Sequence, residues 1–234
     1  RLPARDDGGT QPLTSALRVD HAIGAIGVRV MQSARCLDRI AEDWHRDHLS
    51  DNWWREGTDA FIKELPSGAS VLDVGCGGGM KSKYLIEHGF KVVGIDISDK
   101  LLDIARREVP NGDFRILSMT DLDSMSETFD GVFAQASLLH IPKKDAREVV
   151  KKMSRRLNPS GFLYIAVKEA FEGTPEEEIL KENDYGYEYE RFFSYFTMTE
   201  LEQYLTDAGL KVISKMRNSS PSGKTVWFQI IGRK

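Results

Sequence analysis

The sequence is poor in cysteine, has no long apolar run and carries no excess of basic charge. Its 234 residues include only two cysteines, Cys36 and Cys76, so a disulfide framework is excluded and a reducing, cytoplasmic setting is expected. No apolar run approaches the length of about eighteen residues that a membrane span needs, so we expect no membrane partner. The 32 basic and 36 acidic side chains leave a net charge of −4, which disfavours a nucleic-acid partner, because such binding faces are usually basic.

The first thirty residues differ from the rest of the chain. They show neither clear periodicity nor the order of regions found in a signal peptide, and their aspartates are untypical of a transit peptide. Met31 is one candidate for the natural start of the protein. We therefore expect residues 1–30 to be an N-terminal leader of uncertain origin and residues 31–234 to form a single domain.

Helices and strands alternate along residues 31–234. Two amphipathic helices fall within residues 31–66 and are expected to cover the sheet, and short apolar strands then alternate with further helices. Alternation of this kind predicts parallel βαβ units that are buried on both faces of one sheet. The last two strands, 210–218 and 224–233, are separated only by a short turn-rich link, which predicts antiparallel pairing. The pattern predicts an α/β fold with a doubly wound, mostly parallel seven-stranded sheet and an antiparallel C-terminal hairpin strand.

The stretch VLDVGCGGGM, residues 71–80, places four glycines in five positions directly after an apolar strand. Glycines at this point let the backbone pass close to a ligand before the next helix begins. A dinucleotide-binding loop of the form G-x-G-x-x-G is excluded, because its third glycine would fall on Met80 or Ser82. The letters SGKT at 222–225 resemble the end of a phosphate-binding loop, but Asn218 holds the required upstream glycine position and a strand follows. Neither nucleotide loop is therefore present.

The spacing that does fit is D-x-G-x-G-x-G, formed by Asp73, Gly75, Gly77 and Gly79. With this motif the sequence resembles the class I S-adenosylmethionine-dependent methyltransferases, and the resemblance continues through Asp96, at the end of the second strand, to the final hairpin. It implies a Rossmann-like fold, S-adenosyl-L-methionine as the cofactor and S-adenosyl-L-homocysteine as its product. The residues that it implies for the cofactor site are Trp44, Asp73, Gly75, Cys76, Gly77, Gly79, Asp96, Ile97, Ser118, Met119 and Gln135.

The chemistry of this cofactor suits several of these residues. Asp73 can complement the cationic amino-acid end, and Asp96 can accept hydrogen bonds from two ribose hydroxyls. Ile97 can pack on the adenine, and the resemblance implies that Trp44 covers the methionyl group. Each aspartate also has a simpler interpretation as a helix or turn cap. Ser118 departs from the family, which often has an aspartate at this position for the adenine amino group.

The methyl acceptor is expected beyond the ends of the fourth and fifth strands, on the rim where parallel sheets bind ligands. His140 is the candidate catalytic residue, either as a general base or as a group that orients the acceptor. The alternative is a structural histidine that bonds a loop carbonyl. An acidic, aromatic insertion at residues 169–197 is expected to form a lid, although its phenylalanines favour a place in the core. Its candidate acceptor-binding residues are Tyr185, Tyr187, Tyr189, Arg191 and Tyr195.

Taken together, the motifs predict a methyltransferase that acts on a small molecule, with no nucleic acid, membrane or metal involved. His45 and His48 share one helix face, but no acids complete a known zinc arrangement with them. Two alternatives stay open. The protein could bind the cofactor without turnover, in a regulatory or partner role, or it could be a nucleotide-linked oxidoreductase, although the loop for a dinucleotide is missing.

Overall fold

The computed structural model describes the backbone of residues 25–219 and 225–234, and the side chains from residue 32 onward within those ranges. Residues 1–24 of the expected leader, and most of the link before the last strand, lie outside the described residues. Helix α1 (Ala25–His48) spans the expected boundary at Met31, so the final residues of the expected leader are helical. The division of the chain at Met31 stays a prediction.

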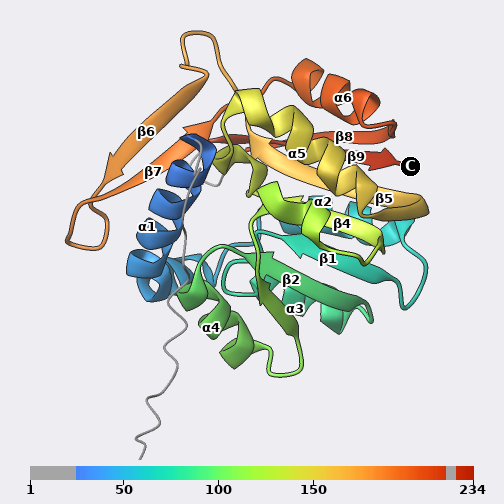
Figure 1. The fold of residues 1–234 in the computed structure, drawn as a ribbon, viewed down its shortest axis with the longest axis horizontal. Coiled ribbons are helices and arrows are strands. Elements are labelled where there is room, and N and C mark those ends of the chain that lie inside the picture. The colour runs from blue at the N-terminus through green and yellow to red at the C-terminus, as the bar shows by residue number, and fades with distance from the viewer. Residues whose placement is uncertain (1–24, 220–224) are drawn as a thin grey trace, which may run out of the picture.

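One mostly parallel sheet forms the centre of the molecule (Figure 1). Its strand order is β3-β2-β1-β4-β5-β9-β8; the first five of these run parallel, and β9 pairs antiparallel with both β5 and β8. The predicted seven-stranded, doubly wound sheet with its antiparallel C-terminal hairpin is therefore confirmed. The strands are β1 (Ser70–Val74), β2 (Lys91–Asp96), β3 (Asp113–Ile116), β4 (Phe129–Gln135), β5 (Leu157–Lys168), β8 (Lys211–Ser219) and β9 (Val226–Arg233).

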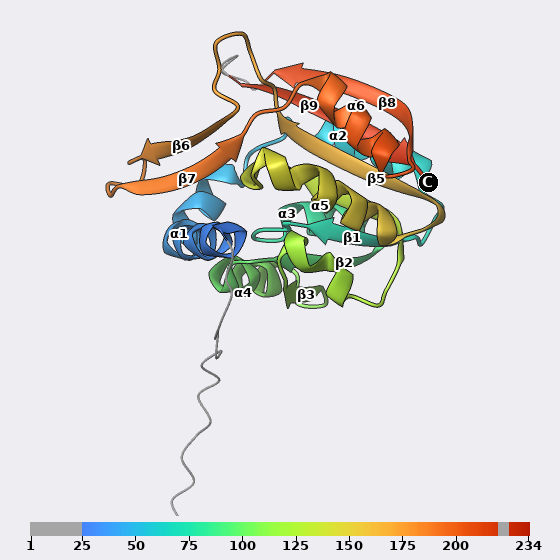
Figure 2. The ribbon, with the colours of Figure 1, turned by 45° about the horizontal axis from the view of Figure 1, so that its top comes forward.

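Helices cover both faces of the sheet (Figure 2). Alternation along β1 explains the two layers: Leu72 and Val74 join the core on one face, and Val71 joins the core on the other. The first face is covered by α5 (Lys143–Arg155) and α6 (Met198–Asp207), and the second by α2 (Arg55–Glu64), α3 (Met80–Glu87) and α4 (Asp99–Glu108). Within the described residues, no helix is both long and apolar enough to cross a membrane.

Helix α5 shows how the sequence pattern becomes packing. Ala146, Val149, Val150 and Met153 recur at helical spacing and are all at most 2% exposed, while the charged side chains between them face solvent. Full burial of a side chain the size of valine or methionine contributes about 1.5–3 kcal/mol. This stripe therefore fixes α5 to the sheet, and the turns at its ends are positioned with it.

The insertion at residues 169–197 contains a two-stranded hairpin, β6 (Glu177–Glu182) and β7 (Tyr189–Ser194). The sequence predicts a lid at this place but no strands, because β6 reads EEILKE and lacks the apolar alternation of a buried strand. Figure 1 shows the hairpin running out from the sheet and lying beside α1. The guanidinium of Arg39 on α1 donates to the carbonyl of Glu188 just before β7, at 3.0 Å. Helix α1 and the hairpin thus form one wall above the carboxyl edge of the sheet.

Candidate functional site

A cavity of about 590 Å³ lies at the carboxyl ends of the parallel strands, where the sheet order switches between β1 and β4. Open α/β sheets bind ligands at such a switch point. The walls come from the glycine loop after β1, the end of β2, the turns η1 (Met119–Ser124) and η2 (Leu138–His140), helix α1 and the hairpin. The volume lies within the range of roughly 300–1,000 Å³ that is typical of small-molecule sites.

The cavity brings together most of the residues that the sequence singles out. Residues predicted for the cofactor and residues predicted for the acceptor line the same space. Those in its wall are Trp44, Gly75, Gly77, Asp96, Ile97, Ser118, Met119, His140, Tyr189 and Arg191. The predicted residues outside its wall are Asp73, Cys76, Gly79, Gln135, Tyr185, Tyr187 and Tyr195.

The glycine loop follows β1 and packs against the turn that comes after β4. The backbone N–H groups of Gly75 and Cys76 both donate to the carbonyl of Ile95, at 2.8 and 3.0 Å, so the loop is fixed to the end of β2. Gly75 has a φ of 77°, and a Cβ added to it would lie 2.5 Å from the Cβ of Ser137. Only glycine allows this close approach. The loop therefore presents bare backbone to the cavity.

Helix α1 lies directly on the glycine loop. A Cβ added to Gly77 would lie 3.6 Å from the ring of Trp44, which stacks on His48 at 4.3 Å between ring centroids. The neighbouring His45 packs against Gly78, where an added Cβ would come within 2.5 Å of its Nδ1. In the described part of the chain no group of three or more possible ligands surrounds a metal position. Trp44 therefore closes the loop side of the cavity, and its predicted contact with the methionyl group stays a prediction.

Asp96 sits at the bottom of the cavity with its carboxylate held by backbone N–H groups. Gly77 donates to Oδ2 at 2.9 Å, and Ser98 donates to Oδ1 at 3.0 Å. Burial raises the pKa of Asp96, and these hydrogen bonds oppose that shift. Each carboxylate oxygen has a second lone pair, so the group can still accept hydrogen bonds from two hydroxyls in the cavity. The cap interpretation and the ribose interpretation of Asp96 are therefore compatible.

Asp73 is only 2% exposed and lies outside the cavity wall. The hydroxyl of Ser82 in α3 donates to its Oδ2 at 2.6 Å. Burial raises the pKa of Asp73 to about 6, and this hydrogen bond and the charge of Lys81 partly oppose the shift. In the structure the carboxyl of Asp73 fixes the first turns of α3. Its predicted contact with the cationic end of the cofactor stays a prediction.

Three further predicted residues lie outside the cavity wall and pack within the protein. Cys76 is buried in a core cluster with Phe114, and burial raises the pKa of its thiol well above the ordinary value. Gly79 is the N-cap residue of α3, and a Cβ added to it would lie 3.0 Å from the Cβ of Ala105. The Oε1 atom of Gln135 accepts a hydrogen bond from the hydroxyl of Tyr164 at 2.6 Å, and its buried Nε2 has no partner in the described chain. Direct contacts of these residues with a ligand stay predictions.

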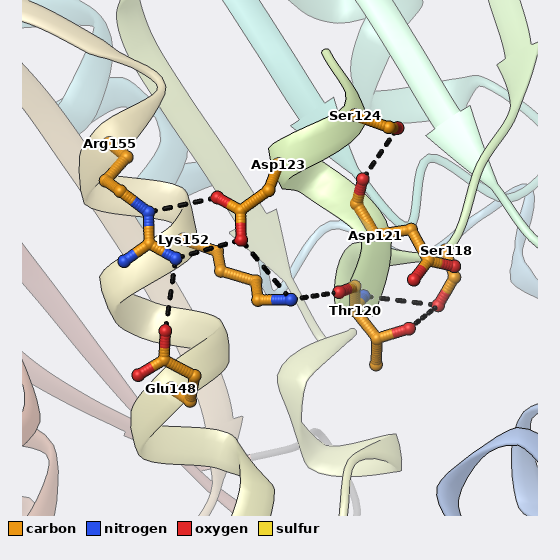
Figure 3. Close-up of polar contacts among 8 residues, drawn as sticks. All are labelled: Ser118, Thr120, Asp121, Asp123, Ser124, Glu148, Lys152 and Arg155. Atoms are coloured by element: carbon orange, nitrogen blue, oxygen red, sulfur yellow. Dashed lines mark hydrogen bonds and ion pairs between the residues drawn. The ribbon is translucent and has the colours of Figure 1, made fainter. Parts of the chain in front are cut away.

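Turn η1 brings Ser118 to the cavity. The backbone N–H of Thr120 donates to the hydroxyl of Ser118 at 3.2 Å, so this serine caps the turn. Figure 3 shows how α5 fixes the turn: the ammonium of Lys152 donates to the carbonyl of Thr120 at 2.5 Å, and Arg155 donates to Asp123 at 3.0 Å. The hydroxyl of Ser118 is thus already used as a cap. Its predicted contact with an adenine amino group stays a prediction.

His140 ends turn η2 and lies in the cavity wall. Its Nδ1 lies 2.8 Å from the carbonyl oxygen of Phe192, and because a carbonyl can only accept, Nδ1 carries the proton. Burial, together with the charges of Arg191 and Lys168, lowers the pKa of His140 to about 4, although the hydrogen bond to Phe192 opposes the shift. The imidazole is therefore neutral at pH 7, and Nε2, which has no hydrogen bond to a described residue, can accept a proton. The carbonyl contact expected of a structural histidine is therefore present and leaves Nε2 free, and the catalytic role of His140 stays a prediction.

Two lid residues enter the cavity wall from β7. Tyr189 is 5% exposed, and burial raises the pKa of its hydroxyl. Arg191 makes a bidentate pair with Glu182 of the opposite strand, from Nε at 2.5 Å and from Nη2 at 2.6 Å. Such a pair holds the guanidinium in one orientation. The hairpin therefore carries its two predicted acceptor residues on one rigid face.

The other three lid tyrosines hold the hairpin instead of lining the cavity. The hydroxyl of Tyr187 donates to Asp43 on α1 at 3.0 Å, and that of Tyr195 donates to Glu178 on β6. The ring of Tyr185 stacks on Tyr189, with 5.4 Å between centroids. Their predicted contacts with the acceptor stay predictions, whereas in the structure they pack and hydrogen-bond within the lid or, for Tyr187, to α1.

Sequence reasoning missed two parts of the wall. Ser137 lies in it with a buried hydroxyl that has no hydrogen-bond partner among the described residues. Its place just after β4 is the same signal that singles out Gln135, so the sequence could have found it. One face of α1, including Arg35, Cys36 and Arg39, also lines the cavity. No local motif marks that face, because it meets the hairpin about 150 positions later in the chain.

Comparison with known proteins reveals a family match and partial relatives. A model of the methyltransferase domain family matches residues 45–215. The chain is 36% identical over 154 residues to a ubiquinone biosynthesis O-methyltransferase of Xylella fastidiosa, covering 55% of this chain and 62% of that protein. It is 31% identical over 137 residues to the protein of the same name from Xanthomonas axonopodis, covering 50% and 56%. The chain thus spans less than two thirds of these relatives.

Solved structures share the fold over more of the chain. The 1,6-didemethyltoxoflavin-N1-methyltransferase of Burkholderia thailandensis, with bound 1,6-didemethyltoxoflavin and S-adenosylhomocysteine, has a TM-score of 0.72 and 20% identity, covering 92% of this chain and 93% of that one. The N-methyltransferase NodS of Bradyrhizobium japonicum, in complex with S-adenosylhomocysteine, has a TM-score of 0.68 and 16% identity, covering 87% and 98%. At these identities the likeness concerns the fold.

Proposed function

Because the chain belongs to the methyltransferase domain family, we propose that it moves a methyl group from S-adenosylmethionine to the hydroxyl of a small molecule. The observation that carries this proposal is a single cavity that joins the glycine loop to the neutral imidazole of His140. The names of the two sequence relatives favour oxygen as the acceptor atom. A reducing, cytoplasmic setting belongs to the proposal, since Cys36 and Cys76 are both free thiols.

The residues of the cavity fit this cofactor. Gly75 and Gly77 of the glycine loop line the cavity, and Asp96 has lone pairs for two ribose hydroxyls. The unpartnered hydroxyl of Ser137 supplies a further polar contact at the same end. Trp44 and Met119 add apolar and aromatic surface around that space. When bound, the cofactor supplies a methyl group on a positively charged sulfur.

The chain's own residues supply position and a proton acceptor. Methyl transfer is an in-line displacement, so a wall that fixes the acceptor contributes much of the acceleration. A hydroxyl acceptor loses its proton during transfer, and Nε2 of His140 is the free, unprotonated nitrogen that can take it. The carbonyl of Phe192 keeps the imidazole in the required tautomer. The pKa of about 4 makes His140 a weak base, so positioning carries more of the effect than proton transfer.

The two alternative functions have less support. A protein that only binds the cofactor does not need a catalytic group facing the same cavity, yet His140 and Arg191 both face it. An oxidoreductase would need a dinucleotide loop, and the third glycine of such a loop is replaced by Met80 or Ser82. We therefore place the enzyme ahead of both.

Calorimetric titration with S-adenosylmethionine, S-adenosylhomocysteine and NAD tests the proposal. We expect the first two to bind, NAD not to bind, and Asp96→Ala to lose at least about tenfold in affinity, because it removes charge-assisted hydrogen bonds. Asp99→Ala is the matched control, since this exposed acid lies three residues away on the surface of α4. Preference for NAD, or no binding of either adenosyl compound, would overturn the proposal.

A further inference from the structure

At the hairpin end of the cavity, where the acceptor is expected to bind, most of the charged groups are positive. Arg35, Arg39 and Arg191 reach the cavity wall there, and Glu190 is the acid among the lining residues at that end. Glu190 is exposed and paired: its side chain is 55% exposed, and Lys181 lies 3.5 Å from its Oε1. Asp96 lies at the glycine-loop end, where backbone N–H groups hold it. Among the described lining residues, a cationic acceptor would therefore meet no carboxylate without a partner at the hairpin end.

Arg191 is the best placed of these cations. Its Nε and Nη2 atoms are used by Glu182, which leaves Nη1 without a hydrogen bond to a described residue. The guanidinium side chain is 21% exposed and its partner 18% exposed, so the pair is largely removed from water. Arg191 directly precedes Phe192, whose carbonyl holds His140. The free guanidinium nitrogen and the free imidazole nitrogen are thus carried by adjacent parts of the same wall.

A second cation lies behind this wall without an ion pair. The ammonium of Lys168, at the carboxyl end of β5, lies 3.8 Å from the ring centroid of Phe193, and among the described residues it has no hydrogen bond or salt bridge. Burial and the charge of Arg191 lower the pKa of Lys168 to about 8, although Glu182 and Glu178 act the other way. Burial is the largest of these causes, so the ammonium of Lys168 is poorly solvated behind the wall. A negative charge brought into the cavity would interact favourably with both cations.

We propose that the acceptor is an acidic hydroxy compound whose carboxylate pairs with Nη1 of Arg191 while its hydroxyl faces Nε2 of His140. This inference rests on the proposed function and specifies its substrate class. A carboxylate that meets a preoriented, partly desolvated guanidinium forms a charge-assisted hydrogen bond, which is about twice as strong as a neutral one. Arg191 is then the residue that determines acceptor specificity.

Three phenols whose para substituents are anionic, neutral and cationic test the proposal: 4-hydroxybenzoate, its methyl ester, and tyramine. Each is titrated by calorimetry into the protein saturated with S-adenosylhomocysteine. We expect 4-hydroxybenzoate to bind at least about tenfold more tightly than the ester, and tyramine to bind most weakly. Equal or tighter binding of the ester, or no binding of 4-hydroxybenzoate, overturns the assignment of an acidic acceptor.

Variants locate the effect at Arg191. The double variant Glu182→Gln with Arg191→Met removes both charges of the pair, so that no unpaired carboxylate is left in the hairpin. It should bind 4-hydroxybenzoate and the ester equally, with an unchanged affinity for S-adenosylhomocysteine. The control Lys181→Met with Glu190→Gln removes the exposed pair of the same hairpin and should keep the preference. A preference that survives in the first variant overturns the role of Arg191.

The two proposals fail in distinguishable ways. If S-adenosylhomocysteine does not bind, the proposed function fails, whatever the phenols do. If it binds and the neutral ester is preferred and methylated, the function stands and the acidic acceptor is wrong. The melting temperature of each variant, measured with and without S-adenosylhomocysteine, separates loss of recognition from loss of folding.

Discussion

At the glycine-loop end of the cavity, polar groups are held by backbone hydrogen bonds of the central sheet, whereas at the hairpin end side chains hold one another. Asp96 and the loop depend on N–H and carbonyl groups between β1 and β2. The hairpin depends on pairs such as Tyr187 with Asp43 and Arg191 with Glu182. Substitutions can therefore change the second end without disturbing the sheet. One fold can keep a constant ligand at the first end and vary the ligand at the second.

The largest expected effect comes from adding a side chain at Gly75, where the glycine loop packs tightly against Ser137. Gly75→Ala adds a Cβ that would lie 2.5 Å from that of Ser137, at a φ of 77°. We expect the affinity for S-adenosylhomocysteine to fall at least about 100-fold, because the strained loop must move. Gly68→Ala is the control: its φ is 73°, but nothing lies within 4 Å of the added atom. Wild-type affinity in Gly75→Ala would show that the loop can relax.

The next effect separates chemistry from binding at the hairpin end. His140→Gln keeps a polar group but removes the proton acceptor, and we expect kcat to fall about 100-fold, at the low end for a general base. The affinity for S-adenosylhomocysteine should not change. His88→Gln is the control, because Nδ1 of His88 makes the same kind of bond, to the carbonyl of Tyr84 at 2.8 Å, on an exposed surface. An unchanged kcat in His140→Gln would leave His140 a purely structural role.

The third effect compares the stability of the two ends as a function of pH. His140 has a folded pKa of about 4, below its ordinary 6.5, so the unfolded chain binds more protons and stability falls as pH drops between these values. Asp73 has a folded pKa of about 6, above its ordinary 3.8, so its contribution falls as pH rises over a similar interval. The two trends oppose each other in the wild type.

Urea unfolding of His140→Gln and wild type between pH 4 and 6.5 resolves these trends. The free energy of unfolding of the variant, relative to wild type, should increase as the pH is lowered, because the variant lacks the histidine that resists protonation. A difference that stays constant with pH would mean that the imidazole is not buried in the folded protein.

The smallest expected effect lies at the lid's exposed contact with α1. Tyr187→Phe removes the hydrogen bond to Asp43, and we expect KM for the acceptor to rise less than about threefold, because exposed polar pairs contribute little. Tyr84→Phe, which loses a bond to Asp59 away from the cavity, is the control. A loss of binding at the loop end in Tyr187→Phe would show that the two ends are more tightly coupled than their contacts indicate.

The same contrast explains what the sequence could predict. The spacing of Asp73, the loop glycines and Asp96 is local along the chain, and the structure brings Gly75, Gly77 and Asp96 to one cavity. The periodicity of the apolar residues predicts the parallel strands and the helices between them, and the observed strand order agrees with that prediction. These features need only short-range pattern and general rules of βαβ packing.

The structure of the hairpin end could not be predicted from local sequence patterns. Its wall depends on contacts between α1 and residues about 150 positions later, such as Arg39 with Glu188. Tyr189 pairs with Glu182 at the start of β7, whereas Tyr187 lies in the turn before that strand, and the sequence of β6 does not indicate a strand. The aspartate at position 73 was a ligand candidate by motif, yet its burial against Ser82 depends on the packing of α3.

The position of Trp44 on Gly77 has a consequence for the order of events in turnover. Helix α1 lies over the glycine loop at this point, and Arg39 and Tyr187 link the helix to the hairpin. Under the proposed function we therefore expect an acceptor beneath the hairpin to slow release of the cofactor, so that the two ligands bind and leave in order. Opening of such a lid is often slower than chemistry. Under the proposed function we expect release of the spent cofactor to be the slow step, with a first turnover faster than all later ones as its signature.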